Sequence, residues 1–181
     1  INPFSNSCGN WTGNSINWVV KSLKTLPDNP LNGIAQQSNA TNQSISDKKI
    51  VSTDPPYYDN IAYADLSDYF YIWLRHSLKG IFPNLFATLS VPKGEELVAL
   101  SHRHGSKKKA EKFFLEEMTK AISQLSKLSH PGFPITIYYA FKQSESKEEN
   151  KTVSTGWETF LSALIKSNLS ISGTWPIHTE R

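Results

Sequence analysis

The chain has 181 residues, enough for one domain with its own core over residues 1–181, and its formal net charge of +3 permits a nucleic-acid partner without requiring one. Its single cysteine, Cys8, excludes an internal disulfide framework, and no Cys/His cluster has the spacing of a zinc site. No apolar stretch approaches the roughly 20 residues of a membrane span, so we expect a cytoplasmic protein without a membrane partner.

Hydrophobic spacing predicts the elements in the first half of the chain. Apolar residues recur at helical spacing over 15–26, where Pro27 ends the predicted helix. We expect short strands over 33–38 and 48–53. The clearest helix spans 65–79, because large apolar and aromatic side chains recur there every three or four residues. We expect that aromatic face to pack into the core.

In the second half of the chain, predicted helices again alternate with predicted strands. Residues 81–108 are predicted to form mostly loop, and 109–128 a helix with one apolar face. The run 133–141 is β-branched and aromatic, which predicts a buried strand. A further helix is predicted over 155–166, and alternating apolar residues predict a final strand over 169–175.

Alternating helices and strands favour an α/β fold, a layered sheet with helices on both faces. Ligands of such sheets bind at the carboxyl ends of the strands. The strand predicted over 48–53 leads directly into residues 54–57, so we expect a site there.

Residues 54–57 combine an acid, two prolines and an aromatic ring: Asp54, Pro55, Pro56 and Tyr57. Asp54 can accept a hydrogen bond from an exocyclic amine. Proline has no N–H and fixes φ, so the loop is stiff and its carbonyl groups can point into a site. The tyrosine ring offers a flat face on which a base can stack. Taken alone, these four residues also suit a surface turn.

The longer run from Asp54 to Arg75 closely resembles the adenine-specific DNA methylases of the large bacterial and archaeal type. Three further stretches resemble the same family: Asn2–Ser5 with Gly9–Trp11, His102–Gly105 with the lysines after it, and Thr174–Ile177. The resemblance implies methyl transfer from S-adenosylmethionine to the N6 amine of adenine in DNA. It implies that Asp54, Pro55, Pro56 and Tyr57 form the catalytic loop that holds a flipped base, and it implies no metal.

The chain departs from this family at the cofactor. The family binds S-adenosylmethionine through a glycine-rich turn after the first strand, whereas residues 2–7 begin like that turn and lack its glycines. We therefore expect a partial Rossmann-like methyltransferase sheet without the cofactor-binding first strand. The upstream half of the same polypeptide would be its partner, and the chain alone would be inactive. Asn39 stands where the family has an acidic residue near the cofactor, which implies a cofactor contact; an ordinary loop asparagine is the alternative.

A basic stretch precedes and opens the helix predicted over 109–128. Its cationic residues are Arg103, Lys107, Lys108 and Lys109, which we expect to bind nucleic-acid phosphates. A solvated loop is the alternative interpretation. The histidines nearby, His102 and His104, do not form a metal site without further ligands.

Two other functions remain open at the level of sequence. The same four-residue loop occurs in enzymes that methylate amines of RNA bases, so the polymer is undecided. Because the glycine-rich turn is missing, a non-catalytic nucleic-acid-binding module is the second alternative.

Overall fold

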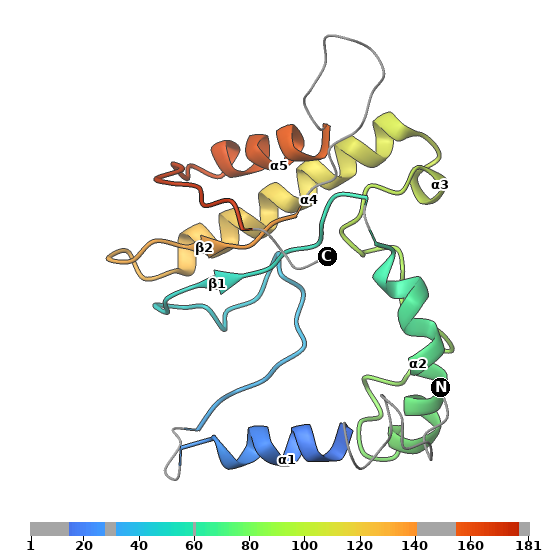
Figure 1. Cartoon of the computed structure of the whole chain (residues 1–181). Helices are drawn as coiled ribbons and strands as arrows, with labels where there is room; N and C mark the ends of the chain where they lie inside the picture. The colour runs from blue at the N-terminus through green and yellow to red at the C-terminus, as the bar shows by residue number, and fades with distance from the viewer. Residues whose placement is uncertain (1–14, 28–31, 60, 141–154, 178–181) are drawn as a thin grey trace. The chain divides into compact units, whose positions relative to one another are not determined.

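The computed structural model describes residues 15–27, 32–59, 61–140 and 155–177 (Figure 1). The chain divides into two compact units, Ile1–Gln37 and Ser38–Arg181, and each is described by itself. The single domain over 1–181 stays a prediction.

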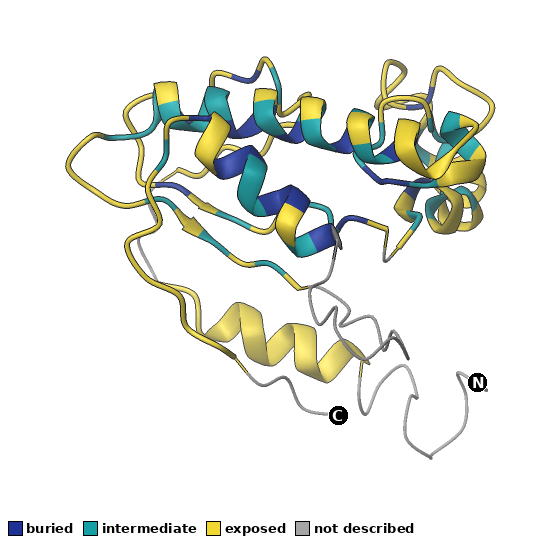
Figure 2. Cartoon of the chain, turned by 90° about the horizontal axis from the view of Figure 1, so that it is seen from above, coloured by how far each residue is buried: buried dark blue, intermediate teal, exposed yellow. Residues whose placement is uncertain are grey.

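The first unit contains helix α1 (Asn17–Lys24), which lies within the helix predicted over 15–26. No residue of α1 is buried, and Figure 2 shows the helix exposed along its length. The Lys21 ammonium lies 5.3 Å from the centre of the Trp18 ring, a cation–π contact on the helix surface.

The second unit holds the remaining described elements. They are β1 (Ser52–Thr53), α2 (Tyr63–Leu78), α3 (Ser101–His104), α4 (Lys107–Leu128), β2 (Thr136–Ile137) and α5 (Thr155–Lys166). The helices predicted over 65–79, 109–128 and 155–166 are confirmed, with α4 beginning two residues earlier than expected. Ser106 explains that earlier start, because its hydroxyl accepts a hydrogen bond from the Lys109 N–H and caps the helix.

Strands β1 and β2 pair in parallel, with Ser52 opposite Thr136 and Thr53 opposite Ile137. The Tyr138 N–H donates to the Thr53 carbonyl at 2.9 Å and closes the pair at its carboxyl end. Both strands are much shorter than the predicted runs over 48–53 and 133–141. The second run is also half exposed at Phe133 and Tyr138, so the prediction that it is buried throughout is wrong.

The main core lies between α4 and α5. Figure 2 shows buried residues on both helices, and they form one cluster with two residues from the loops. The cluster contains Tyr58, Ala99, Ala110, Phe114, Met118, Ile122, Phe160, Ala163 and Leu164. Apolar residues at helical spacing on α4 and α5 therefore bury each other, which is the usual reason for such a pattern.

Helix α2 is held by polar contacts with the loop that follows it. The Asp68 carboxylate accepts hydrogen bonds from the Val91 N–H at 2.8 Å and from the Lys93 ammonium at 2.6 Å. The Tyr71 hydroxyl and the Arg75 Nε both donate to the Thr88 carbonyl at 2.9 Å. These contacts fix residues 88–93 along the helix.

The apolar face of α2 is not part of the core, and that prediction is wrong. Within the part of the chain that the structure describes, its large side chains are exposed: Leu66, Tyr69, Phe70, Trp73 and Leu74. The helical spacing was interpreted correctly as a helix. Burial depends on a neighbouring element, however, and none of the described segments of the second unit covers this face.

Two predicted strands are absent from the described residues. Residues 33–38 and 169–175 are both irregular. A strand exists only where a neighbour accepts and donates its backbone hydrogen bonds, and alternation in the sequence does not supply that neighbour. Ile34 and Trp175 are accordingly among the most exposed apolar side chains. The described elements thus form a mixed α and β unit with one parallel strand pair, and the Rossmann-like sheet stays a prediction.

Candidate active site

The carboxyl ends of the parallel strands bring two tyrosine-containing segments together. Strand β1 leads directly into Asp54–Tyr57, and β2 leads into Tyr138 and Tyr139 at the same end of the pair. The Tyr57 and Tyr139 rings meet edge to face, with centroids 5.5 Å apart and planes at 78°. This edge is where α/β sheets place their ligand sites.

Asp54 and Tyr57 form one unit within the loop. The Tyr57 hydroxyl donates a hydrogen bond of 2.6 Å to Oδ1 of Asp54, whose side chain is exposed to solvent. This hydrogen bond raises the pKa of Tyr57 to about 12, because the hydroxyl must keep its proton to donate to the Asp54 carboxylate. Pro55 and Pro56, which lie between the two, are half-buried and limit the motion of the turn.

Tyr58 anchors the loop in the core. Its side chain is only 8 % exposed, and its ring packs against Phe114 of α4 at 5.1 Å. Its carbonyl accepts a hydrogen bond of 2.7 Å from the Ala99 N–H. Burial raises the pKa of Tyr58 to about 12. The loop is therefore exposed at Asp54 and fixed four residues later.

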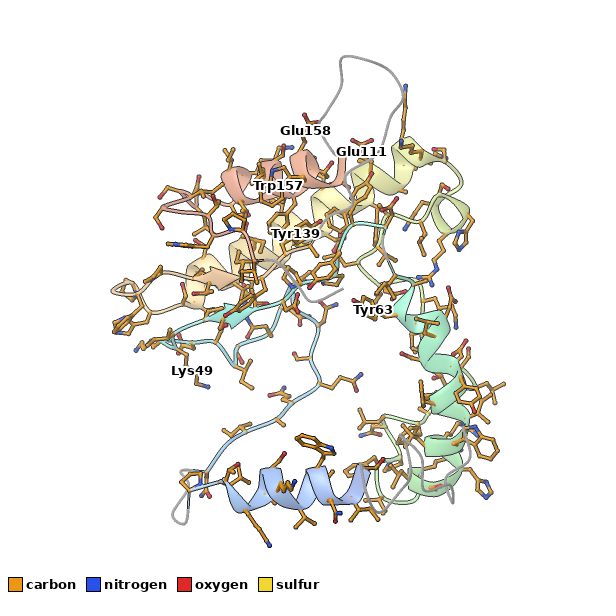
Figure 3. The ribbon with its side chains drawn as sticks, in the orientation of Figure 1. Lys49, Tyr63, Glu111, Tyr139, Trp157 and Glu158 are labelled. Atoms are coloured by element: carbon orange, nitrogen blue, oxygen red, sulfur yellow. The ribbon has the colours of Figure 1, made fainter. Side chains whose placement is uncertain are left out.

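Tyr139 is the residue of this site that the sequence analysis did not identify. It contacts Tyr57 through its ring and Tyr58 through its hydroxyl, and burial raises its pKa to about 12. It lies close to Trp157 of α5, with ring centroids 6.0 Å apart (both are labelled in Figure 3). The sequence placed it inside the strand predicted over 133–141, and only the end of β2 at Ile137 in the structure places it at the carboxyl end of the strand pair.

Asn39 is engaged locally. Its Oδ1 accepts hydrogen bonds from the Thr41 N–H at 2.9 Å and from the Thr41 hydroxyl at 2.8 Å. The side chain thus closes a turn of its own loop, as asparagine often does. A cofactor role for Asn39 stays a prediction.

Arg103 is held in ion pairs within the second unit. Its guanidinium donates to the Glu96 carboxylate and, at 2.7 Å, to Asp65 of α2. The other oxygen of Glu96 accepts the Ala64 N–H at 2.9 Å and so caps the start of α2. Both hydrogen bonds raise the pKa of Arg103, the bond to Glu96 more than the bond to Asp65. This arginine joins α3 to α2, a role that its place in a basic stretch did not suggest.

Lys107, Lys108 and Lys109 differ from Arg103, because all three are exposed in the first turn of α4. Cations are unfavourable at a helix N-terminus, where the unpaired N–H groups already carry partial positive charge. The same field attracts phosphate groups. The first turn of α4 therefore concentrates positive charge that no acidic residue of that turn offsets.

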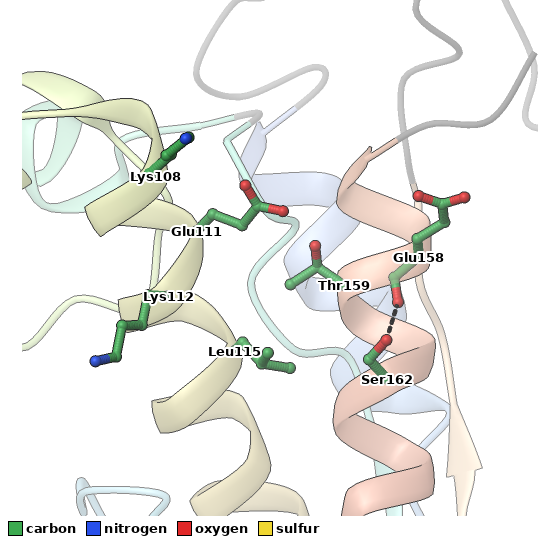
Figure 4. Close-up of a pocket in the computed structure, with 7 residues that line it drawn as sticks. All are labelled: Lys108, Glu111, Lys112, Leu115, Glu158, Thr159 and Ser162. Carbon is green, nitrogen blue, oxygen red and sulfur yellow. Dashed lines mark hydrogen bonds between the residues drawn. The ribbon is translucent and has the colours of Figure 1, made fainter. Parts of the chain in front are cut away.

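An open groove lies between α4 and α5 (Figure 4). Lys108, Glu111, Leu115 and Thr159 are among the residues that line it. It contains none of Asp54–Tyr57, and its charges are of both signs. Because the groove is shallow and open, we assign the candidate site to the loop at the strand ends.

In comparisons with known proteins, no family model, curated protein or solved structure matches the chain. Within the described ranges, no helix has the length and apolar character that crossing a membrane requires. The same ranges contain no cluster of three His, Cys, Asp or Glu side chains that could hold a metal ion.

Proposed function

We propose that this chain supplies the base-binding loop of an enzyme that methylates the N6 amine of adenine in DNA with S-adenosylmethionine as the methyl donor. The observation that supports the proposal is the loop Asp54–Tyr57. It follows β1 at the carboxyl end of a parallel strand pair and presents an exposed carboxylate joined to an aromatic ring by a 2.6 Å hydrogen bond.

An aromatic amine is a poor nucleophile because its lone pair is delocalised into the ring. A hydrogen bond from the amine to Asp54, and a second to the Pro55 carbonyl, would draw electron density back onto the nitrogen. The donor supplies the methyl group as an electrophile. Asp54 is also placed to accept the proton that the nitrogen loses once it is methylated. No covalent intermediate with the protein is needed, so much of the acceleration comes from positioning.

The hydrogen bond between Tyr57 and Asp54 does not prevent amine binding. A carboxylate has two oxygens that can together accept about four hydrogen bonds, so Asp54 keeps acceptor capacity for an amine. The bond also fixes the carboxylate relative to the ring of Tyr57. A base stacked on that ring would therefore bring its amine to a carboxylate of defined position.

DNA is the proposed polymer, and the lysines of α4 are its proposed phosphate contacts. Lys107, Lys108 and Lys109 are exposed, so phosphate groups can reach them. They also lie at a helix N-terminus, which favours phosphate binding. The target base must first leave the duplex, which costs a few kcal/mol. A cytoplasmic location, where DNA and the donor are both present, belongs to the same proposal.

The test is to express the full-length gene product in cells that lack their own adenine methylation and to identify the methylated nucleoside that it produces. DNA and RNA are digested separately, and methylated nucleosides are quantified by mass spectrometry. We expect N6-methyldeoxyadenosine in DNA and its loss in the Asp54→Ala variant.

The other outcomes separate the alternatives. Methylated amines in RNA alone would replace DNA by RNA as the substrate. A stable gene product that binds DNA but methylates neither polymer would contradict the enzymatic function and favour a non-catalytic binding module.

A further inference from the structure

We propose that Tyr139 is a positioning residue for the loop Asp54–Tyr57. The consequence for catalysis rests on the proposed function, whereas the positioning itself does not. Tyr139 makes two contacts with the loop. Its hydroxyl accepts a hydrogen bond of 3.2 Å from the Tyr58 N–H, and its ring lies edge to face against Tyr57 at 5.5 Å.

Tyr139 can position the loop because it is itself fixed from two sides. Its ring stacks on Phe160 of α5 with centroids 3.9 Å apart and planes at 6°. Its neighbour Tyr138 donates its N–H to the Thr53 carbonyl of β1, which holds the backbone in register. Phe160 belongs to the core cluster between α4 and α5, so the stacking support is itself well packed.

These contacts connect α5 to the proposed base site. The Tyr58 N–H belongs to the peptide group that follows Tyr57, so its hydrogen bond limits rotation at that peptide. The edge-to-face contact restricts the plane of the Tyr57 ring, and the hydroxyl of that ring holds the Asp54 carboxylate. Misplacing a catalytic group by about 1 Å can reduce the rate by roughly 10²-fold. Tyr139 therefore sets the geometry of two groups without touching the substrate.

The test uses the Tyr139→Phe variant, which removes one hydroxyl and retains the ring, with Tyr138→Phe as the matched control. Tyrosine labelled with ¹⁵N and carbonyl ¹³C selects amides whose residue and predecessor are both tyrosine. In the printed sequence these are Tyr58 and Tyr139 alone. Either substitution removes the second signal, so the Tyr58 amide is identified and compared directly between the two variants.

We expect the Tyr58 amide proton to move upfield in Tyr139→Phe relative to Tyr138→Phe, because it loses its acceptor. In transfer assays with the full-length gene product, we expect kcat to fall on the order of tenfold in Tyr139→Phe. The KM for the methyl donor should remain that of the control. A variant that merely unfolds would lower the active fraction and would move the Tyr58 signal to the position of an unfolded chain.

Each other result overturns a defined part of the inference. An unchanged Tyr58 amide would show that Tyr139 does not hold the loop. A shifted amide with unchanged kcat would show that the contact has no catalytic consequence. If the unmodified gene product transfers no methyl group, the proposed function fails, and the amide comparison alone decides whether Tyr139 positions the loop.

Discussion

At the scale of single residues, Tyr57 carries two separable properties. Its hydroxyl binds Asp54, and its ring offers an aromatic face beside Tyr139. Stacking of a base on such a ring is worth about 1–3 kcal/mol, and a hydrogen bond to a charged group is worth about 1.5–3 kcal/mol. The two properties can therefore be assigned by substitution.

We predict that Tyr57→Phe lowers kcat on the order of tenfold, because Asp54 loses the hydroxyl that orients it, and that Tyr57→Leu lowers kcat/KM for nucleic acid by a further tenfold or more. Tenfold corresponds to about 1.4 kcal/mol, which lies within the range for one stacked base. Steady-state kinetics with varied nucleic acid would measure both values. Equal losses in the two variants would show that the hydroxyl, and not the ring, carries the function of Tyr57.

The sequence predicted the residues of this loop better than it predicted their partners. Asp54 and Tyr57 are three residues apart, so a local motif reveals both. The contact between Tyr58 and Tyr139 joins residues 81 positions apart, and no local pattern encodes it. Arg103 shows the same limit, because its acid partners Glu96 and Asp65 lie outside the basic stretch in which it was first grouped.

At the scale of elements, the start of α5 packs closely against Tyr58, which anchors the loop Asp54–Tyr57. A methyl group added at Gly156 would lie 3.0 Å from both Cβ and Cγ of Tyr58. These atoms are next to the backbone of Tyr58 and cannot swing away as the end of a long side chain can. Glycine at this position therefore permits the contact between the start of α5 and the anchor of the loop.

We predict that Gly156→Ala destabilises the chain, although alanine is the better helix former. Overpacking costs about 1–3 kcal/mol, and the gain in helix propensity is at most about 1 kcal/mol. Urea unfolding would measure the change. Gly94→Ala is the control, because nothing lies within 4 Å of a methyl group there, and we expect its effect to stay within about 0.5 kcal/mol. A gain in stability at Gly156 would contradict the close packing.

A second prediction at this scale concerns the N-terminus of α4 and its three exposed lysines. Replacing Lys107, Lys108 and Lys109 together by alanine should weaken DNA binding and lower its salt dependence. Each lost phosphate contact reduces the slope of log K against log salt by roughly 0.9. The same substitution should slightly stabilise the helix, because it removes cations from the N-terminal end of the dipole. Binding at several salt concentrations and thermal unfolding would test both parts.

The matched control removes the same charge from helix C-termini. Lys79, Lys127 and Lys166 are exposed at the ends of α2, α4 and α5. Either triple substitution brings the formal net charge of the chain from +3 to zero. We expect the control to bind DNA more tightly than the first variant and to lose a little stability. Equal binding by the two variants would mean that only net charge matters.

Helices were predictable because their signal is local, whereas strands were predictable only in part. Strands β1 and β2 lie within the runs predicted over 48–53 and 133–141, but each is only two residues long. The helices over 65–79, 109–128 and 155–166 were predicted from apolar spacing, and α5 ends where Asn168 adopts a left-handed φ of 59° and the Leu169 N–H bonds back to the Leu164 carbonyl. The strands over 33–38 and 169–175 required neighbours that the described chain does not provide.

At the scale of the second unit, the core has a definite location. Phe114 on α4 is 0 % exposed, whereas Trp73 on α2 is 66 % exposed, although both occupy apolar positions at helical spacing. The sequence pattern alone treats them alike. Only the placement of α5 against α4 distinguishes them.

We predict that Phe114→Ala lowers the free energy of unfolding by about 3–5 kcal/mol and that Trp73→Ala changes it by no more than about 0.5 kcal/mol. Urea unfolding of the full chain, followed by circular dichroism, would measure both. A large loss for Trp73→Ala would show that the aromatic face of α2 is buried after all.

The central claim is that Asp54 binds the amine that is methylated. Its most direct test is transfer from labelled S-adenosylmethionine to DNA and RNA in parallel, comparing Asp54→Asn with Asp59→Asn in the full-length gene product. Both variants remove one negative charge from the same loop, and Asp59 is exposed. We predict label in DNA for the unmodified protein and for Asp59→Asn, with a loss of two orders of magnitude or so in Asp54→Asn. Equal activity of the two variants would contradict the account.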